Sequence, residues 1–492
     1  MDIRTPESMG LSSKVIENYL KSLDAAHLVT HDIIIARGDS ILFETYVPPF
    51  TAGDTHRMYS VSKSIVSLAV GFALDDGLLS LDDPVDKYFA KELEGQTDEN
   101  FRHMTVRNML MMATAKHPQN WFAARTDDRV RYYFQNPTAF TRTPGTMFEY
   151  DSTGSFVVGA LIERLTGMKF MDYLRGKLFD KIGVSEKAHC LTCPGGHSWG
   201  DSACLMTPRD LLLCARFTLN GGSWEGKQLV SADYIREATS CLISTDEGKG
   251  IVSDSGYGYY IWKTFGEGFF FNGMGCQFAV CVPEKDMILI YNGDNQGIEG
   301  AIVPIIHGFF EQIIPAVSDA ALPDDPAAQA SLASYANGMK LTAAWMEKTS
   351  PMAQKVSGVT YTLNENPMGM TEFTLTLDGA EGNFSYHNAQ GDKSFAFGMG
   401  ENRFGVFPQD GYSKEIGSVP GDERYRCAAS AAWKTPDTLY MKVQLMSDYF
   451  GNFDAYFTFS EDGKTVSVSM EKHAEDFLSE YNGSASGTAK RS

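Results

Sequence analysis

The spacing of hydrophobic positions changes along the chain and predicts its elements. Apolar side chains at helical intervals predict a helix over residues 11–26. The stretch DIIIARGDSILFETY (32–46) predicts two strands about a Gly-Asp turn. Residues 57–77 contain a long apolar run typical of a buried helix, and aromatic and β-branched residues over 256–292 predict consecutive antiparallel strands. Strands at both ends with helices between them indicate one α/β (α+β) domain, with helices flanking an antiparallel sheet.

The pattern changes after about residue 318. The stretch 318–333 is rich in Ala, Asp and Pro and predicts a linker, followed by a helix to about Lys348. Beyond it, short segments alternate between apolar and polar residues and are separated by Gly, Asp and Asn, which predicts an all-β, barrel-like domain. We therefore expect an α/β domain over 1–318, a linker and helix over 319–354, an antiparallel β domain over 355–483 and a disordered tail over 484–492.

Composition narrows the possible partners. The net charge of -20 argues against nucleic acid and anionic membrane surfaces, since both require a basic footprint. No run of 18 apolar residues occurs, so we expect no membrane span. The eight cysteines are sparse for 492 residues, and the first residues lack an apolar signal core. These features favour a cytoplasmic location, unless an export signal precedes this sequence.

One cysteine pair has the spacing of a metal or redox motif. The stretch HCLTCPGGH (189–197) contains Cys-x-x-Cys between two histidines. A zinc finger needs a second ligand pair at matching spacing, which the sequence lacks, and Pro and Gly favour an irregular loop. We therefore expect neither a metal ion nor a cofactor.

Polar residues gather at the start of the helix predicted over 57–77. Ser60 and Lys63 are three residues apart, so a helix places both side chains on one face. Free backbone N–H groups at a helix start favour negative charge, as acyl transfer requires. Taken alone, the pattern fits an N-cap serine with an exposed lysine at least as well. His56, four residues before Ser60, is expected at the surface or as a cap.

The same Ser-x-x-Lys pattern occurs a second time, at Ser469 and Lys472. Apolar and polar residues alternate there, which predicts a strand. In a strand, Ser469 lies on the polar face and Lys472 points to the opposite side. We therefore do not expect this second pair to act together.

A lysine acts as a base only where its proton is loosely held. The pKa of a free lysine is about 10.4, so deprotonation at pH 7 costs ~4.6 kcal/mol. Burial or a phenolic neighbour lowers that cost, and the apolar run after Lys63 favours burial. Tyr150, in the loop before an apolar helix predicted from Gly154 to Leu165, is a candidate neighbour. Its alternative is an ordinary half-buried tyrosine.

These stretches together resemble a known family. YSVSKSIVSLAVGFALDDGLLSLDDPVDKYF resembles the nucleophile helix of the serine β-lactamase-like superfamily, nearest to class C β-lactamases, D,D-peptidases and related esterases and amidases. PGTMFEYDSTGSFVVGALIERLTG resembles its second motif, and FFFNGMGCQFAVCVPEKDMILIYN lies where its third motif is expected. The stretch SACLMTPRDLLLCARFTLNGGSWEGKQLVS resembles the segment between them. The resemblance covers about residues 8–315, and the C-terminal domain is similar to lipocalin-like modules appended to some members.

The resemblance implies roles for individual residues. Ser60 attacks a carbonyl, Lys63 and Tyr150 share the general-base work, and Ser152 orients Lys63 or the leaving group. An acyl-Ser60 intermediate forms and is then hydrolysed by water.

The third motif implies an oxyanion hole and departs from the family. The hole is formed by the backbone N–H groups of Ser60 and of Cys276, which follows Gly275. The usual Lys-Thr-Gly or His-Thr-Gly is replaced by Gly273-Met274-Gly275, so the cation that holds a substrate carboxylate is missing. We expect the substrate pocket to include Trp121, Met274 and Tyr259.

We expect a serine hydrolase acting on a small ester, amide or D-amino-acid-type peptide. A β-lactamase or D,D-peptidase (penicillin-binding protein) is one alternative, and a non-catalytic binding protein with a degenerate site is another. Acyl transfer to an acceptor other than water also stays open. The expected partner is a small-molecule substrate, and the C-terminal domain is expected to restrict the cleft or to mediate a homodimer.

Overall fold

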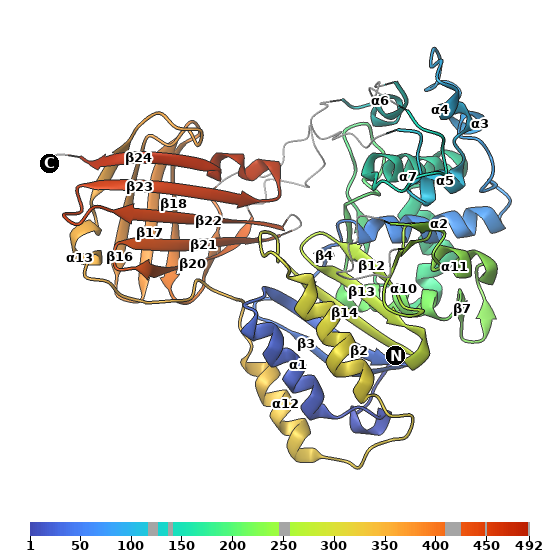
Figure 1. Ribbon diagram of the computed structural model, residues 1–492, viewed down its shortest axis with the longest axis horizontal. Coiled ribbons are helices and arrows are strands. Elements are labelled where there is room, and N and C mark those ends of the chain that lie inside the picture. Colours follow the sequence, from blue (N-terminus) through green and yellow to red (C-terminus); the bar gives the residue numbers. More distant parts are fainter. Residues whose placement is uncertain (117–125, 136–140, 246–255, 409–424, 448–449, 491–492) are drawn as a thin grey trace. The chain divides into compact units, whose positions relative to one another are not determined.

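The computed structural model describes residues 1–116, 126–135, 141–245, 256–408, 425–447 and 450–490 (Figure 1). These residues form two compact units. The first comprises Met1–Gly293 and Ile298–Lys340, and the second comprises Asp294–Gly297 and the described residues from Leu341 onward.

The first unit is built on a nine-stranded sheet in the order β1-β3-β2-β14-β13-β12-β11-β10-β9. Figure 1 shows the blue strands of the N-terminal region beside the yellow strands from near residue 290. The sheet therefore contains both parts of the domain, which confirms the predicted α/β class. It is mixed rather than wholly antiparallel, because the edge strand β1 pairs in parallel with β3. Its strands are β1 (Asp2–Ile3), β2 (Thr30–Arg37), β3 (Ser40–Tyr46), β9 (Ile243–Ser244), β10 (Gly256–Tyr257), β11 (Trp262–Lys263), β12 (Phe269–Gly273), β13 (Gln277–Val282) and β14 (Met287–Gly293).

Helices cover this sheet. Helix α10 packs on β2, β13 and β14, helix α2 packs on β12, and α1 packs with α12. The helices are α1 (Ser13–Ala25), α2 (Val61–Asp75), α3 (Asp86–Phe89), α4 (Glu99–His103), α5 (Val106–Leu110), α6 (Arg129–Gln135), α7 (Ser152–Thr166), α8 (Phe170–Leu174), α9 (Asp180–Ile182), α10 (Pro208–Leu219), α11 (Ala232–Ala238) and α12 (Pro326–Gly338). None of the helices in the described ranges has the length and apolar character that crossing a bilayer requires.

Shorter elements complete the first unit. A three-stranded sheet has the order β4-β6-β5, and β7 pairs with β8. These strands are β4 (His56–Arg57), β5 (His189–Cys190), β6 (Cys204–Met206), β7 (Ser223–Trp224) and β8 (Lys227–Gln228). The short helical turns are η1 (Glu7–Met9), η3 (Arg175–Phe179), η5 (Pro283–Lys285), η6 (Val303–His307), η7 (Phe309–Ile313) and η8 (Ile314–Ala316).

Helix α2 is the core helix predicted over 57–77. Every side chain from Val61 to Ala73 is buried, as is typical of a helix that is covered on all sides. Its serines are buried with hydrogen-bond partners. Ser64 donates to the Tyr260 carbonyl at 2.7 Å, and the Ser62 hydroxyl accepts the backbone N–H of Cys204 at 2.9 Å. Polar residues on this helix are therefore fixed in place.

The second unit is a closed nine-stranded β-barrel. The order β18-β17-β16-β15-β24-β23-β22-β21-β20 closes where β18 pairs with β20, and β19 adds to β20 outside the ring. This confirms the predicted β domain, whose pairings are antiparallel except at the closure, where β18 and β20 are parallel. Its likeness to lipocalins stays a prediction. The elements are β15 (Thr360–Leu363), β16 (Glu372–Asp378), β17 (Glu381–Asn388), β18 (Gly391–Met399), β19 (Arg403–Val406), β20 (Arg426–Thr435), β21 (Thr438–Met446), β22 (Phe450–Phe459), β23 (Thr465–His473) and β24 (Gly483–Ala489), with α13 (Ala353–Val356) and η9 (Asp476–Tyr481).

The predicted disordered tail and linker were partly wrong. Residues Gly483–Ala489 form strand β24, which pairs with β15 and β23. The small residues of this segment suggested disorder, but hydrogen bonds from a strand on each side order its backbone. Helix α12 begins at Pro326, inside the predicted linker, because the Asp325 carboxylate caps it by accepting the N–H of Ala328 at 3.0 Å. It ends at Gly338, well before Lys348.

Candidate active site

Ser60 immediately precedes α2 and is half-buried. The residue before it, Tyr59, has a φ of 43°, in the left-handed region that non-glycine residues rarely adopt. Such a conformation persists only where its surroundings hold it. The Arg57 guanidinium lies 4.6 Å from the ring centres of both Tyr59 and Trp199, and its Nε donates to the Ser202 carbonyl at 3.0 Å. These contacts of Arg57 therefore hold the turn before Ser60 in place.

Lys63 is buried beside this serine. Its side chain is 1% exposed, and Nζ donates to Ser60 Oγ at 2.9 Å and to the Asp201 carbonyl at 2.7 Å. Nζ also lies 5.0 Å from the centre of the Tyr150 ring. The three residues that the sequence pattern singled out thus come together, and the amine directly contacts the hydroxyl that it would deprotonate.

Tyr150 is held in place by the cap of helix α7. The carboxylate of Asp151 accepts the Gly154 N–H at 2.9 Å, the Tyr133 hydroxyl at 3.1 Å and the Thr114 hydroxyl at 3.2 Å. Asp151 is fully buried, and this burial raises the pKa of its carboxyl group. Because of this cap, α7 begins at Ser152, two residues earlier than predicted.

An aromatic wall adjoins Tyr150. Its ring stacks on that of the half-buried Trp262, with centroids 5.8 Å apart and planes at 23°. Trp262 in turn contacts Phe148 and Tyr257 edge-on. Among the described residues, the hydrogen bonds of Lys63 Nζ go to Ser60 and Asp201 rather than to Ser152. The orienting role of Ser152 therefore stays a prediction.

The third motif lies at the end of β12 and in the hairpin loop that leads to β13. Gly275 and Cys276 have φ angles of 78° and 72°, so the backbone reverses through two left-handed residues. The Gln277 side chain is buried, and its Nε2 donates to the Met274 carbonyl at 3.2 Å, which fixes the loop. Cys276 is buried and the Met274 side chain is exposed. The place of Met274 in a substrate pocket stays a prediction.

Gly273 explains why this loop carries no cation. A Cβ at this position would lie 2.4 Å from the Met58 carbonyl oxygen and 3.3 Å from a Val61 methyl group. The backbone is thus packed directly against the segment that carries Ser60, and a lysine or histidine has no room. The same approach brings the loop of Cys276 towards the start of α2, although the oxyanion role of its N–H stays a prediction.

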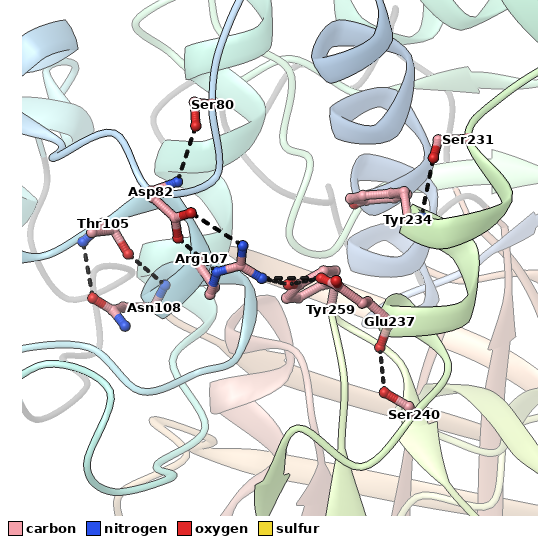
Figure 2. Close-up of polar contacts among 10 residues, drawn as sticks. All are labelled: Ser80, Asp82, Thr105, Arg107, Asn108, Ser231, Tyr234, Glu237, Ser240 and Tyr259. Carbon is pink, nitrogen blue, oxygen red and sulfur yellow. Dashed lines mark hydrogen bonds and ion pairs between the residues drawn. The ribbon is translucent and has the colours of Figure 1, made fainter.

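Tyr259 belongs to a different cluster, shown in Figure 2. Its hydroxyl donates to Glu237 Oε2 at 2.7 Å and bonds to Arg107, which also pairs with Asp82 at 2.8 Å. Tyr259 has no exposed surface, so the prediction that it lines a substrate pocket was wrong. The other predicted aromatic lining residue, Trp121, lies outside the described residues.

Two further residues have environments that the sequence pattern did not indicate. Asp201, 138 residues from Lys63, supplies the carbonyl that binds its amine. His56, predicted as a surface or capping residue, is fully buried with Nε2 3.4 Å from the Asp32 carboxylate. Burial lowers the pKa of His56 to about 4, so the ring is neutral at pH 7.

The cysteine-rich stretch 189–197 forms a strand and a turn. Cys190 on β5 lies opposite Cys204 on the neighbouring strand β6, and both are free cysteines. The Cys193 N–H donates to the His197 carbonyl at 2.7 Å. Within the part of the chain that the structure describes, no three His, Cys, Asp or Glu side chains are grouped to hold a metal ion.

The chain is similar to known proteins over much of its length. The family model described as Beta-lactamase matches residues 16–296. A 6-aminohexanoate-dimer hydrolase from Paenarthrobacter ureafaciens is 27% identical over 237 residues, covering 44% of this chain and 60% of the relative. Penicillin-binding protein 4* from Bacillus subtilis (strain 168) is 22% identical over 190 residues, covering 35% and 41%. The chain thus spans less than two thirds of either relative.

The chain also resembles a solved structure. A protein from Bacteroides dorei DSM 17855, described as a candidate beta-lactamase, has a TM-score of 0.51 at 16% identity. The match covers 61% of this chain and 98% of that one. At this identity the likeness shows a shared fold.

Proposed function

This chain belongs to the Beta-lactamase family, and from that premise we propose that it is a serine hydrolase whose Ser60 is acylated by the substrate. One observation carries the proposal: the buried Lys63 amine is hydrogen-bonded to Ser60 Oγ at 2.9 Å. A serine hydroxyl is a weak nucleophile until a neighbouring base takes its proton. In the second Ser-x-x-Lys pair, Lys472 Nζ instead donates to the Glu475 carbonyl at 3.1 Å.

The proposed reaction proceeds in two acyl transfers. Ser60 Oγ attacks the carbonyl carbon as its proton passes to the Lys63–Tyr150 pair, and the proton then goes to the leaving alcohol or amine. Backbone N–H groups of Ser60 and Cys276 bind the oxyanion. Water then attacks the acyl-enzyme through the same base and releases the acid.

The substrate that we propose is a small ester or amide rather than a β-lactam. Gly273 occupies the place of the usual cation, and its close approach to the Met58 carbonyl leaves no space for one. The half-buried ring of Trp262 next to Tyr150 offers an apolar surface for an acyl group. The name of one relative, 6-aminohexanoate-dimer hydrolase, supports an amide among the candidates.

Intact-mass measurement on a substrate panel tests this proposal. The panel contains p-nitrophenyl butyrate, the 6-aminohexanoate dimer, a peptide ending in D-Ala-D-Ala and benzylpenicillin. We expect a short-lived acyl adduct and turnover with the ester, and neither with the Ser60→Ala protein.

Faster turnover of penicillin than of the ester, or a stable penicilloyl adduct, would contradict the substrate class and favour the lactamase or D,D-peptidase reading. The similarity to a penicillin-binding protein gives that reading its support. No adduct with any panel member would favour the non-catalytic binding protein.

A further inference from the structure

Asp201 approaches the proposed base through its backbone and through its side chain. Its carbonyl accepts the Lys63 amine at 2.7 Å. Because carbonyl and carboxyl belong to one residue, this bond also keeps the carboxyl group within roughly 8 Å of the amine. The neighbouring residues hold this turn rigidly, since Arg57 stacks on Trp199 at 4.6 Å and donates to the Ser202 carbonyl.

The Asp201 carboxyl group is buried in an unusual way. It is 1% exposed, and its Oδ1 has no hydrogen-bond partner among the described residues. A buried carboxylate with one unbonded oxygen depends in part on nearby cations for its stabilisation. The charged and titratable groups that interact electrostatically with it are Lys63 on α2, Arg57 on β4, Arg129 on α6, Tyr260, Cys190 and Cys193.

We propose that Asp201 is a positioning residue of this active site: its carbonyl holds the Lys63 amine against Ser60, and the charge on its carboxyl group sets the pH at which that amine acts as a base. This inference rests on the proposed function. It assigns a role to a residue outside the Ser-x-x-Lys and Tyr-x-Ser motifs.

The charges around Asp201 determine in which direction its replacement should move the pH profile of activity. Burial raises the pKa of Asp201 to about 6, while Lys63 and then Arg129 and Arg57 act to lower it, so the group is ionised at neutral pH. An ionised carboxylate stabilises the protonated form of Lys63. Replacing it with a neutral group removes this stabilisation of the charged amine, so we expect the acid limb of the activity profile to move towards lower pH.

The Asp201→Asn variant tests the proposal, because it keeps the carbonyl and the shape and removes only the charge. The readout is kcat/KM for p-nitrophenyl butyrate between pH 5 and 9, with kcat and KM determined separately. We expect the midpoint of the acid limb to move about one unit towards lower pH, with KM changed less than about twofold. If this variant fails to fold, Asp201→Ser, smaller and also neutral, is expected to give a shift in the same direction.

Asp210→Asn is the matched control. Asp210 is a buried aspartate of the same unit, and its carboxylate accepts the Ser185 N–H and hydroxyl, both at 2.7 Å. Its loss lowers the melting temperature and leaves the midpoint of the pH profile unchanged. An Asp201→Asn midpoint equal to that of the wild type, or an equal shift in the Asp210→Asn protein, would overturn the inference alone. A wild-type protein that no ester acylates would overturn the proposed function as well.

Discussion

Ser60 and Lys63 lie at the start of a helix, whereas Ser469 and Lys472 lie on a β-strand, although both pairs have the same spacing. The helix brings Lys63 Nζ to 2.9 Å from Ser60 Oγ. On β23 the exposed Ser469 side chain is separated from Lys472, whose Nζ instead donates to the Glu475 carbonyl at 3.1 Å. Secondary structure and burial thus determine whether the serine and lysine of a Ser-x-x-Lys pair contact each other.

Two tyrosines extend this comparison. Tyr150 lies under the Lys63 amine at 5.0 Å and stacks on Trp262. Tyr456, the cross-strand neighbour of Ser469, lies under the Lys434 amine at the same 5.0 Å and stacks on Tyr440 at 5.1 Å. A cation over a tyrosine ring is therefore not sufficient for a site. The distinguishing contact is a buried lysine bonded to a serine hydroxyl.

Replacing the two serines in turn gives the largest expected difference. We expect Ser60→Ala to lower kcat/KM for p-nitrophenyl butyrate by a factor of at least about 10³, because the nucleophile is lost. The Ser469→Ala protein should retain the wild-type value, since this side chain is exposed on the barrel. More than a tenth of the activity remaining in Ser60→Ala would show that Ser60 is not the nucleophile.

Replacing the two lysines should give the second-largest difference in activity between the two Ser-x-x-Lys pairs. Lys63→Met keeps most of the buried volume and removes the base, so we expect kcat to fall by about 10²–10⁴-fold. Lys472→Met removes the bonds that this amine donates to the Ala474 and Glu475 carbonyls, and it should leave kcat unchanged. Circular dichroism on both proteins checks that each is folded. Equal losses in the two variants would show that the lysines act through stability.

Removing the two tyrosine hydroxyls tests whether Tyr150 takes part in proton transfer. Tyr150→Phe keeps the ring that stacks on Trp262 and removes the proton-transfer group, so we expect kcat to fall about 10²-fold with a small change in KM. Tyr456→Phe, with its equivalent stacking and cation, should have no effect. A full rate in Tyr150→Phe would assign the base work to Lys63 alone.

A pair of glycines gives the smallest expected effect, on stability. Gly273→Ala places a methyl group 2.4 Å from the Met58 carbonyl and should lower the free energy of unfolding by about 1–3 kcal/mol. Gly405→Ala on β19 meets no atom within 4 Å and should be nearly neutral. Scanning calorimetry measures both. An unchanged melting temperature for Gly273→Ala would mean that the hairpin does not press against this segment.

Local patterns predicted much of this organisation. The helical period placed Ser60 and Lys63 on one face of α2, and the apolar run after Lys63 indicated its burial, which the structure confirms. Alternation likewise predicted Ser469 on the polar side of a strand. In each case neighbours close in sequence determine the result, so the spacing of residues carries the necessary information.

Contacts between distant segments were not predictable in this way. Asp201 meets Lys63 across 138 residues, and no local pattern marks its carbonyl or its buried carboxyl group. His56 sits among polar residues in sequence, yet the fold buries it against Asp32. Strand β24 is rich in Ser and Gly and becomes ordered only because the barrel supplies a partner on each side.

Labelling with a fluorophosphonate probe, followed by peptide mapping, shows whether Ser60 is an activated nucleophile. Such a probe reacts only with a serine that a neighbouring base activates. We expect one adduct per chain, on the peptide that contains Ser60, and none on the peptide that contains Ser469. No adduct, or an adduct on any other serine, would contradict this role of Ser60.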